Sequence, residues 1–221
     1  MIITIDGPVA SGKSTVACLL AQHLGALYLN SGLLYRALAY FLSEQGYTPE
    51  QMQHMTIEKV KQLVDVAKFS YVYDDGHASI RYDARDLTPL LKNAVIDQAA
   101  SCLSTVPAVR AFVNDILRAT AHGHTVVIDG RDAGSVIFPD ATHKFFLTAS
   151  PHVRAQRWQA DQAQRGNQYT LQEALAEVNK RDERDSTRAV APLSVPEGAV
   201  LVSTDTDSVL QVVAKLQATL C

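Results

Sequence analysis

The sequence lacks the features of a membrane span, a disulfide scaffold or a nucleic-acid-binding surface. Its three cysteines, Cys18, Cys102 and Cys221, are far apart and form no C-x-x-C pair, so neither a disulfide framework nor a zinc site is indicated. No apolar run approaches the roughly 20 residues that span a bilayer. The net charge is −3 without a basic block, so we expect small, locally bound anionic partners and no nucleic acid.

The composition suits a globular α/β domain with room for an insertion. The chain has 221 residues, of which 47% are hydrophobic and 19% charged. Its first residues read as a core strand rather than a signal peptide. A reducing, ATP-rich cytoplasm is therefore the expected compartment.

A phosphate-binding signature lies near the N-terminus. Residues Gly7 to Ser14 fit G-x-x-x-x-G-K-[ST], the P-loop pattern. An apolar strand, Ile2 to Ile5, precedes it, and a predicted helix, Val16 to Leu24, follows it. In such a loop the backbone N–H groups bind phosphate oxygens, Lys13 reaches the β- and γ-phosphates, and the Ser14 hydroxyl holds Mg²⁺. A glycine turn with a chance lysine is the alternative, and the order of strand, loop and helix argues against it.

Apolar strands alternate with helices along most of the chain, which predicts a parallel sheet covered by helices. Helix starts are indicated by Thr48-Pro49, by Thr88-Pro89 and by a capping box at Thr170 that opens a helix to about Arg184. The predicted strands are Ile2 to Ile5, Leu27 to Leu29, Thr125 to Ile128, Lys144 to Leu147 and Ala199 to Val202.

The segment from Phe69 to Asp86 breaks this alternation. Two predicted strands, Phe69 to Tyr73 and Ala78 to Tyr82, are joined by Asp74-Asp75-Gly76, a hairpin signal. We expect an insertion near the second substrate; an antiparallel extension of the main sheet is the alternative.

The strand Thr125 to Ile128 ends in Asp129, the arrangement that places a carboxylate near Mg²⁺. It continues as Gly130-Arg131-Asp132, a polar turn at the carboxyl end of a strand, where ligands bind in open parallel sheets. A solvated loop would also tolerate these residues.

A charged stretch, Arg181 to Arg188, is the strongest second signal. If the helix persists, it places four charged residues on one face: Arg181, Arg184, Asp185 and Arg188. Three arginines and one aspartate give this face a net positive charge. This pattern favours a lid that closes over phosphates, with Arg154 and Arg157 on its other side. A surface helix with ion pairs is the alternative.

Residues Asn179 to Asp182 also match N-K-x-D, the guanine-reading motif of GTPases. The match lies in a predicted helix, and the sequence contains no D-x-x-G motif, so we interpret it as chance.

Several motifs together resemble the bacterial-type cytidylate (CMP/dCMP) kinases, within the nucleoside monophosphate kinases. The resemblance spans nearly the whole chain in the family's order. It is carried by Gly7 to Thr15, Asn30 to Arg36 (N-S-G-L-L-Y-R), Ala100-Ser101, Val109-Arg110, Asp129 to Asp132 (D-G-R-D), Phe138 to Ala141 and Arg181 to Leu193 (R-D-x-x-R-D-x-x-R-A-x-A-P-L).

This resemblance implies an α/β P-loop fold with a parallel core sheet, and a single kinase domain over 1–221. An inserted NMP-binding part would cover 69–87 and a short helical lid 151–188. The reaction implied is transfer of the γ-phosphate of ATP to CMP or dCMP with Mg²⁺. We expect no membrane association and a monomer. Catalysis would rest on positioning and charge neutralisation, without a general base or a nucleophilic side chain.

The resemblance also assigns residues to roles. ATP would be bound by Gly7, Pro8, Val9, Ala10, Ser11, Gly12, Lys13, Ser14 and Thr15, and Mg²⁺ by Ser14 and Asp129. The acceptor phosphate would be bound by Ser31, Arg36, Arg131 and Arg188, cytosine by Ser101, Arg110 and Asp132, and the sugar by Arg181 and Asp185, with Tyr35 also in the substrate site. The residues implied to be catalytic are Lys13, Arg131, Arg181 and Arg188.

The base-reading roles agree with the chemistry of cytosine, whose N4 amino group donates to a carboxylate and whose N3 and O2 accept from a guanidinium. Uracil presents the acceptor O4 to the carboxylate and the donor N3–H to the guanidinium, so both contacts fail. Without the resemblance, however, Arg110 on the predicted helix Pro107 to Ala121 would read as an exposed helix charge.

Two alternatives remain open on the sequence. One is a P-loop kinase for another small acceptor, such as UMP, AMP or a non-nucleotide metabolite. The other is a non-catalytic P-loop regulator or a nucleic-acid-dependent ATPase, which the net charge and the spare lid arginines disfavour.

Overall fold

The computed structural model describes residues 1–74, 77–91 and 93–220. They form two compact units, Met1–Ala26 with Thr125–Cys221 and Leu27–His124, and each is described by itself. None of the described helices is long and apolar enough to cross a membrane.

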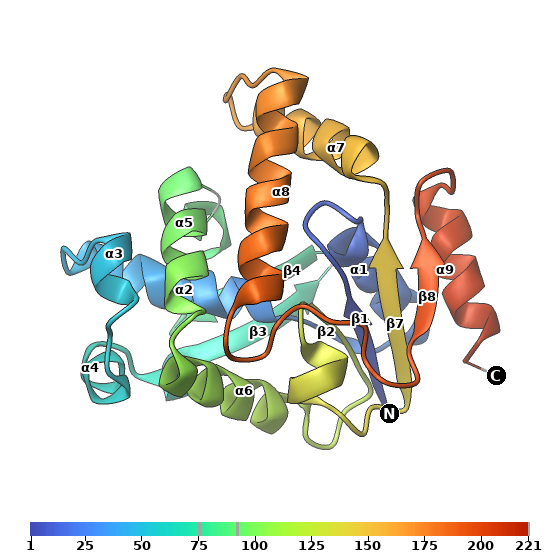
Figure 1. The fold of residues 1–221 in the computed structure, drawn as a ribbon. Coiled ribbons are helices and arrows are strands. Elements are labelled where there is room, and N and C mark those ends of the chain that lie inside the picture. Colours follow the sequence, from blue (N-terminus) through green and yellow to red (C-terminus); the bar gives the residue numbers. More distant parts are fainter. Residues whose placement is uncertain (75–76, 92, 221) are drawn as a thin grey trace. The chain divides into compact units, whose positions relative to one another are not determined.

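The first unit is built on a parallel sheet in the order β6-β1-β7-β8 (Figure 1). Helix α1 packs against β6 and α9, and α7 packs against α8 beyond the end of β7. The elements are β1 (Ile2–Asp6), α1 (Lys13–Leu24), β6 (Val126–Gly130), the π-helical turn η3 (Ala133–Ile137), β7 (His143–Thr148), α7 (Pro151–Gln164), α8 (Leu171–Thr187), β8 (Val200–Ser203) and α9 (Val209–Ala218).

The register of this sheet places the two chemical motifs side by side. Strand β1 is central, and its Ile3 and Ile5 are fully buried. Ile5 lies beside Asp129, and Asp6 beside Gly130. Because the strands are parallel, the loop after β1 and the turn after β6 emerge at the same edge, where ligands bind in α/β sheets. The predicted α/β fold with a parallel core sheet is confirmed.

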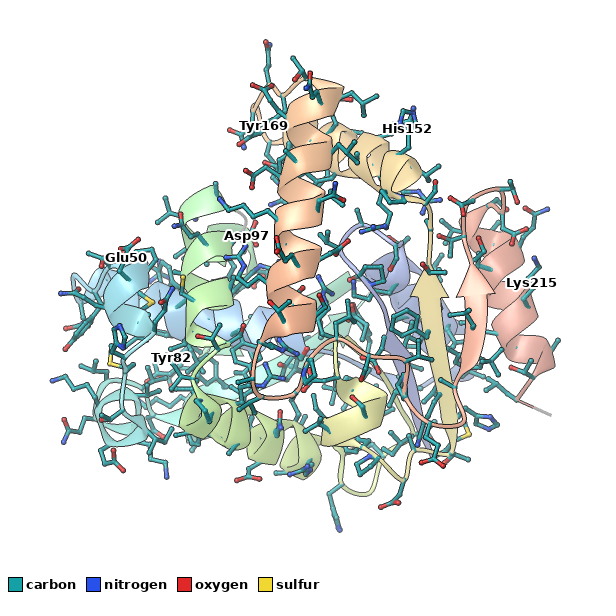
Figure 2. All side chains as sticks on the ribbon, viewed as in Figure 1. Glu50, Tyr82, Asp97, His152, Tyr169 and Lys215 are labelled. Atoms are coloured by element: carbon teal, nitrogen blue, oxygen red, sulfur yellow. The ribbon has the colours of Figure 1, made fainter. Side chains whose placement is uncertain are left out.

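The second unit combines helices with a small antiparallel sheet, β3-β4-β5. The aromatic rings of Phe41, Phe69 and Tyr82 cluster here, with ring centroids 4.5 Å apart for Phe41 and Tyr82. Tyr82 is labelled in Figure 2. Its elements are β2 (Leu27–Asn30), α2 (Ser31–Glu44), α3 (Pro49–Met52), α4 (Ile57–Leu63), η1 (Val66–Lys68), β3 (Phe69–Asp74), β4 (His77–Tyr82), β5 (Arg85–Asp86), η2 (Thr88–Leu91), α5 (Ala94–Leu103) and α6 (Pro107–Ala121).

The predicted hairpin strands are confirmed as β3 and β4, which pair antiparallel from Phe69↔Tyr82 onward. They form a sheet of their own, so the alternative of an extension of the main sheet is wrong. The predicted turn at Asp74-Asp75-Gly76 falls partly on residues 75–76, outside the described residues.

The helix signals were read correctly at two of three positions. Thr48 and Thr170 both form capping boxes, in which each side chain accepts from a backbone N–H three residues on. Thr88 does not start an α-helix, because its hydroxyl accepts instead from the Ile80 N–H at 3.0 Å. Only the short 3₁₀ turn η2 follows it, and the next helix begins after Asn93.

Candidate active site

The loop between β1 and α1 has the geometry of a phosphate-binding turn. Gly7 lies so close to β7 that an added Cβ would be 2.1 Å from the Leu147 carbonyl oxygen, so no other residue fits there. Gly12 has φ +86°, a left-handed conformation that glycine adopts without strain. The Lys13 ammonium donates to the Pro8 carbonyl at 2.8 Å, which folds the side chain back over the loop.

The surroundings of Lys13 favour the binding of an anion. Burial lowers its pKa well below the ordinary value, and the Arg131 guanidinium acts in the same direction. The Asp129 carboxylate acts against both. A buried ammonium surrounded by other cations is stabilised when an anion binds beside it.

Ser14 and Asp129 meet at the point where the loop faces β6. The Ser14 hydroxyl donates to Asp129 Oδ2 at 2.6 Å. A hydroxyl and a carboxylate are oxygen ligands of the kind Mg²⁺ prefers, with phosphate oxygens and water completing its shell. Among the described residues, no group of three or more His, Cys, Asp or Glu side chains is placed so that it could hold a metal ion.

Two residues of the turn after β6 form buried ion pairs with residues at the end of α8 and just after it. Arg131 Nε lies 2.8 Å from Asp185 Oδ2, and Arg188 contacts Asp132 Oδ1 at 3.3 Å. Burial acts to raise the pKa of Asp185, but Arg131, Arg181 and Arg188 together hold it below its ordinary value. The structure thus brings together, within the first unit, the P-loop, Asp129, Arg131, Asp132, Arg181, Asp185 and Arg188.

The expectation that Arg188 shares a helical face with Arg181 is wrong. Helix α8 runs to Thr187, three residues beyond the expected end, and Arg188 follows it in an extended conformation. Its guanidinium donates to the Ala191 carbonyl at 2.6 Å as well as contacting Asp132. The chance interpretation of N-K-x-D is supported, because Asn179 to Asp182 lie inside this helix.

The second unit holds the other predicted substrate residues. Ser31 is the first residue of α2, after the N-cap Asn30, and Tyr35 and Arg36 follow on the same helix. Arg36 forms an ion pair with Asp97 of α5 at 2.7 Å. Asp97 is labelled in Figure 2.

Arg110 is only 3% exposed, so the alternative of an exposed helix charge is wrong. It donates to the Ser104 carbonyl at 3.0 Å, and its guanidinium carbon lies over the Tyr35 ring, 5.8 Å from the ring centroid. Ser101 lies one turn before Ser104, whose hydroxyl donates to the Ser101 carbonyl. A buried arginine beside an aromatic ring is the arrangement of a binding pocket more than of a helix surface.

Sequence reasoning missed a contact between the lid region and the P-loop. Asp182 accepts from the Val9 N–H at 3.2 Å and forms an ion pair with the buried Arg154. Arg154 also donates to the Val9 carbonyl at 3.3 Å. The motifs that contain Asp182 assign it no role, and no local signal marks its partner 173 residues away.

A second unforeseen contact links the P-loop to the segment after β8. Arg157 donates to the Thr204 carbonyl at 2.6 Å and to its hydroxyl at 2.9 Å. The Thr204 hydroxyl in turn donates to the Ser11 carbonyl at 3.0 Å. Arg157 was expected beside the lid, but its role as a partner of Thr204 has no sequence signature.

Asp6, the last residue of β1, was also missed. It is fully buried, and its two carboxylate oxygens accept from the N–H groups of Ala133 and Gly134 at 2.8 and 2.7 Å. Burial raises the pKa of Asp6 from 3.8 to about 6, and Asp132 adds to the rise. The two backbone donors and Lys13 act against it.

The raised pKa of Asp6 predicts how stability should change with pH. Because the folded value of about 6 lies above 3.8, this group favours the folded state at pH below 4, and that contribution is lost as pH rises through 6. Between pH 4 and 7 the wild type should lose about 2 kcal/mol of unfolding free energy relative to Asp6→Asn. Urea unfolding of both proteins across this range measures the difference; parallel curves would contradict the assignment.

A family model and individual relatives both match this chain to cytidylate kinases. The family model described as cytidylate kinase matches residues 3–220. A cytidylate kinase of Chlamydia felis is 41% identical over 220 residues, covering 99% of this chain and 97% of the relative. One from Caldanaerobacter subterraneus is 39% identical over 202 residues, covering 91% and 86%.

Among solved structures, an uncharacterized protein from Eubacterium ventriosum shares the fold, with a TM-score of 0.54, 13% identity and coverage of 99% of this chain and 97% of that one. The family match over nearly every residue, together with relatives near 40% identity, confirms the resemblance read from the motifs: the chain belongs to the cytidylate kinase family.

Proposed function

We propose that this protein transfers the γ-phosphate of ATP to CMP or dCMP through the residues grouped above. Family membership supports the reaction and ATP as the donor. The observation that carries the residue assignment is the contact of Arg188 with Asp132, which lies two residues after β6, the strand that contains Asp129. It supports a base-reading role for the carboxylate and a phosphate-binding role for the guanidinium, both in the unit that holds the P-loop.

On the donor side, backbone N–H groups of the loop from Gly7 to Thr15 bind the ATP phosphates, except at Pro8, which has no N–H, and at Val9, whose N–H donates to Asp182. The Lys13 ammonium neutralises charge on the transferring group. Asp182 and Thr204 hold the loop from outside through Val9 and Ser11. This arrangement orients the phosphates before transfer, which is where most of the catalytic effect in phosphoryl transfer arises.

Ser14 and Asp129 would hold Mg²⁺. When bound, the metal supplies charge that neutralises the β- and γ-phosphate oxygens. The hydrogen bond between the two side chains already sets their oxygens 2.6 Å apart, so little rearrangement is needed for both to face one ion.

On the acceptor side, Arg131 and Arg188, with Ser31 and Arg36, bind the CMP phosphate. A guanidinium suits this task because its planar fork donates to two phosphate oxygens at once. Asp185 holds Arg131 in orientation and accepts a hydrogen bond from a sugar hydroxyl, while Arg181 donates to a sugar oxygen. The low pKa of Asp185 keeps its carboxylate ionised for both tasks.

Cytosine is read by Asp132, Arg110 and Ser101. Asp132 accepts from the N4 amino group, while Arg110 donates to N3 or O2. Arg110 is suited to this because burial and the Tyr35 ring restrict its orientation. A buried pair of this kind discriminates against the wrong base by ~1–3 kcal/mol.

Replacing Asp132 with asparagine tests the substrate assignment. The amide can rotate to present N–H to uracil O4 or C=O to cytosine N4. The variant should lose CMP activity, and its preference for CMP over UMP should narrow about ten- to a hundredfold. A coupled assay with ATP, Mg²⁺ and a panel of CMP, dCMP, UMP and AMP measures this.

Asp140→Asn, an exposed carboxylate in the same region, is the matched control and should behave as wild type. If CMP and UMP turnover fall equally, Asp132 serves the loop or Arg188 rather than the base. An unchanged preference would remove Asp132 from cytosine recognition. Wild-type turnover highest with UMP or AMP would favour a different acceptor.

The remaining expectations follow from the proposed reaction. Both nucleotides occur in the cytoplasm, so we infer that the protein acts there, as a monomer, without nucleic-acid or membrane partners. A single kinase domain with an NMP-binding insertion at 69–87 and a lid at 151–188 remains the predicted organisation.

A further inference from the structure

The carboxylate of Asp6 lies at the centre of the first unit and is used by none of the roles assigned above. It ends β1, one residue before the P-loop begins, and it is fully buried. Each of its oxygens accepts one backbone hydrogen bond, from Ala133 at 2.8 Å and from Gly134 at 2.7 Å. These bonds join two segments that are 127 and 128 residues apart in the chain.

Both donors belong to the turn that carries the recognition residues. Ala133 and Gly134 come directly after Arg131 and Asp132 and open the π-helical turn η3. The Asp132 carbonyl accepts from Val136 at 3.0 Å and Ile137 at 3.1 Å, so this residue is tied to the turn that Asp6 holds. A shift of the Ala133 and Gly134 backbone would therefore move Asp132 and Arg131 with it.

The turn is also packed closely against β1. A Cβ added to Gly134 would lie 2.6 Å from Thr4 Oγ1 and 3.3 Å from Asp6 Oδ2. Thr4 and Asp6 are two residues apart on the strand, so their side chains point to the same face. The absence of a side chain at Gly134 allows the carboxylate to approach the backbone directly.

We propose that Asp6 is a positioning residue for acceptor recognition, fixing the Arg131–Asp132 turn against the strand that leads into the P-loop. The proposal rests on the function proposed above, because it assigns Asp6 an effect on the residues that bind CMP. The carboxylate suits this task because it alone offers two acceptor oxygens to two parallel N–H donors.

The electrostatics of Asp6 support a role beyond folding. Burial and the neighbouring Asp132 both disfavour its ionised form, while Lys13 and the two amides favour it. A neutral side chain would fill the same space without that cost. Groups whose ionisation costs stability are found where activity requires them.

Asp6→Asn is the test. The amide keeps one acceptor oxygen but turns an NH₂ group toward the second backbone N–H, so one of the two bonds is lost. We expect KM for CMP to rise at least tenfold, the preference for CMP over UMP to fall at least fivefold, and KM for ATP to stay within twofold. Hydrogen exchange of residues 131–138 should be faster than in the wild type.

Thr4→Val is the matched control. Thr4 is buried on the same face of β1, and its hydroxyl has no hydrogen-bond partner among the described residues. This variant alters the same packing without touching the two bonds, so wild-type kinetics and wild-type exchange are expected. If Asp6→Asn does not fold, Asp6→Glu keeps the charge but displaces the carboxylate by one methylene, and it should show the same split between the two KM values.

Four results would overturn the inference. Faster exchange with unchanged KM for CMP would make Asp6 a purely structural residue. Equal losses with CMP and UMP, accompanied by a raised KM for ATP, would indicate general damage at the P-loop. A wild type without CMP activity would overturn the proposed function and this inference together, whereas normal wild-type turnover with an unaffected Asp6→Asn would overturn this inference alone.

Discussion

Lys13→Met should reduce phosphoryl transfer roughly 10³-fold or more while the protein stays folded. Methionine is of similar length and is apolar, so it fills the buried position without the ammonium. The lysine is needed because charge develops on the transferring phosphate in a site that excludes water, where one fixed cation counts for much more than in solvent. The loss should therefore appear in kcat.

Steady-state kinetics with saturating CMP and ATP, with a thermal unfolding curve, would measure this effect. Lys144→Met is the control: this lysine also donates to a carbonyl oxygen, that of Glu197 at 3.2 Å, but it lies on β7 outside the P-loop. It should retain wild-type turnover. A Lys13→Met variant with near-native kcat would remove the P-loop lysine from the reaction.

Much of the fold could be predicted because its signals are local. The strand Ile2 to Ile5, the glycine-rich turn and the helix after it are adjacent in the sequence, and their order is itself the motif. The capping box at Thr170 involves residues three apart and gave the start of α8 correctly. The end of that helix has no such signal, which is why it was placed three residues early.

The parts of the site that sequence could not give depend on contacts between distant residues. Asp6 meets Ala133 across 127 positions, and Asp182 meets Val9 across 173. Each side chain is unremarkable in its own segment, since an aspartate can end a strand or occupy a helix surface without any role. Their burial and their backbone partners are decided only when the sheet and the helices pack.

Arg110 and Arg188 show two ways in which a local pattern misleads. The helical pattern places Arg110 on a helix, but it does not predict that the side chain is buried beside Tyr35. For Arg188, spacing from Arg181 predicted a shared helical face, yet the chain leaves the helix at Thr187. The extended backbone of Arg188 after the helix, and not the helical repeat, orients its guanidinium toward Asp132.

Arg188→Ala should lower kcat roughly 10²- to 10³-fold and change KM for ATP only a few fold. The guanidinium is almost wholly buried, and it is the countercharge of Asp132. If it binds the acceptor phosphate during transfer, its contacts are strongest in the transition state. Interactions of that kind appear in kcat, whereas uniform binding appears in KM.

Two single variants and one double variant test this role against that of an ordinary lid arginine. Arg165→Ala removes an arginine of the same region that pairs with Asp161 at 2.8 Å near the end of α7, and it should leave kcat unchanged. Arg188→Lys keeps the charge but loses the planar fork, so it should recover only part of the activity. Asp132→Asn combined with Arg188→Ala should cost less than the sum of the two single changes, because the two side chains are in contact. Wild-type kcat in Arg188→Ala would return Arg181 to Arg188 to the role of a surface ion-pair segment.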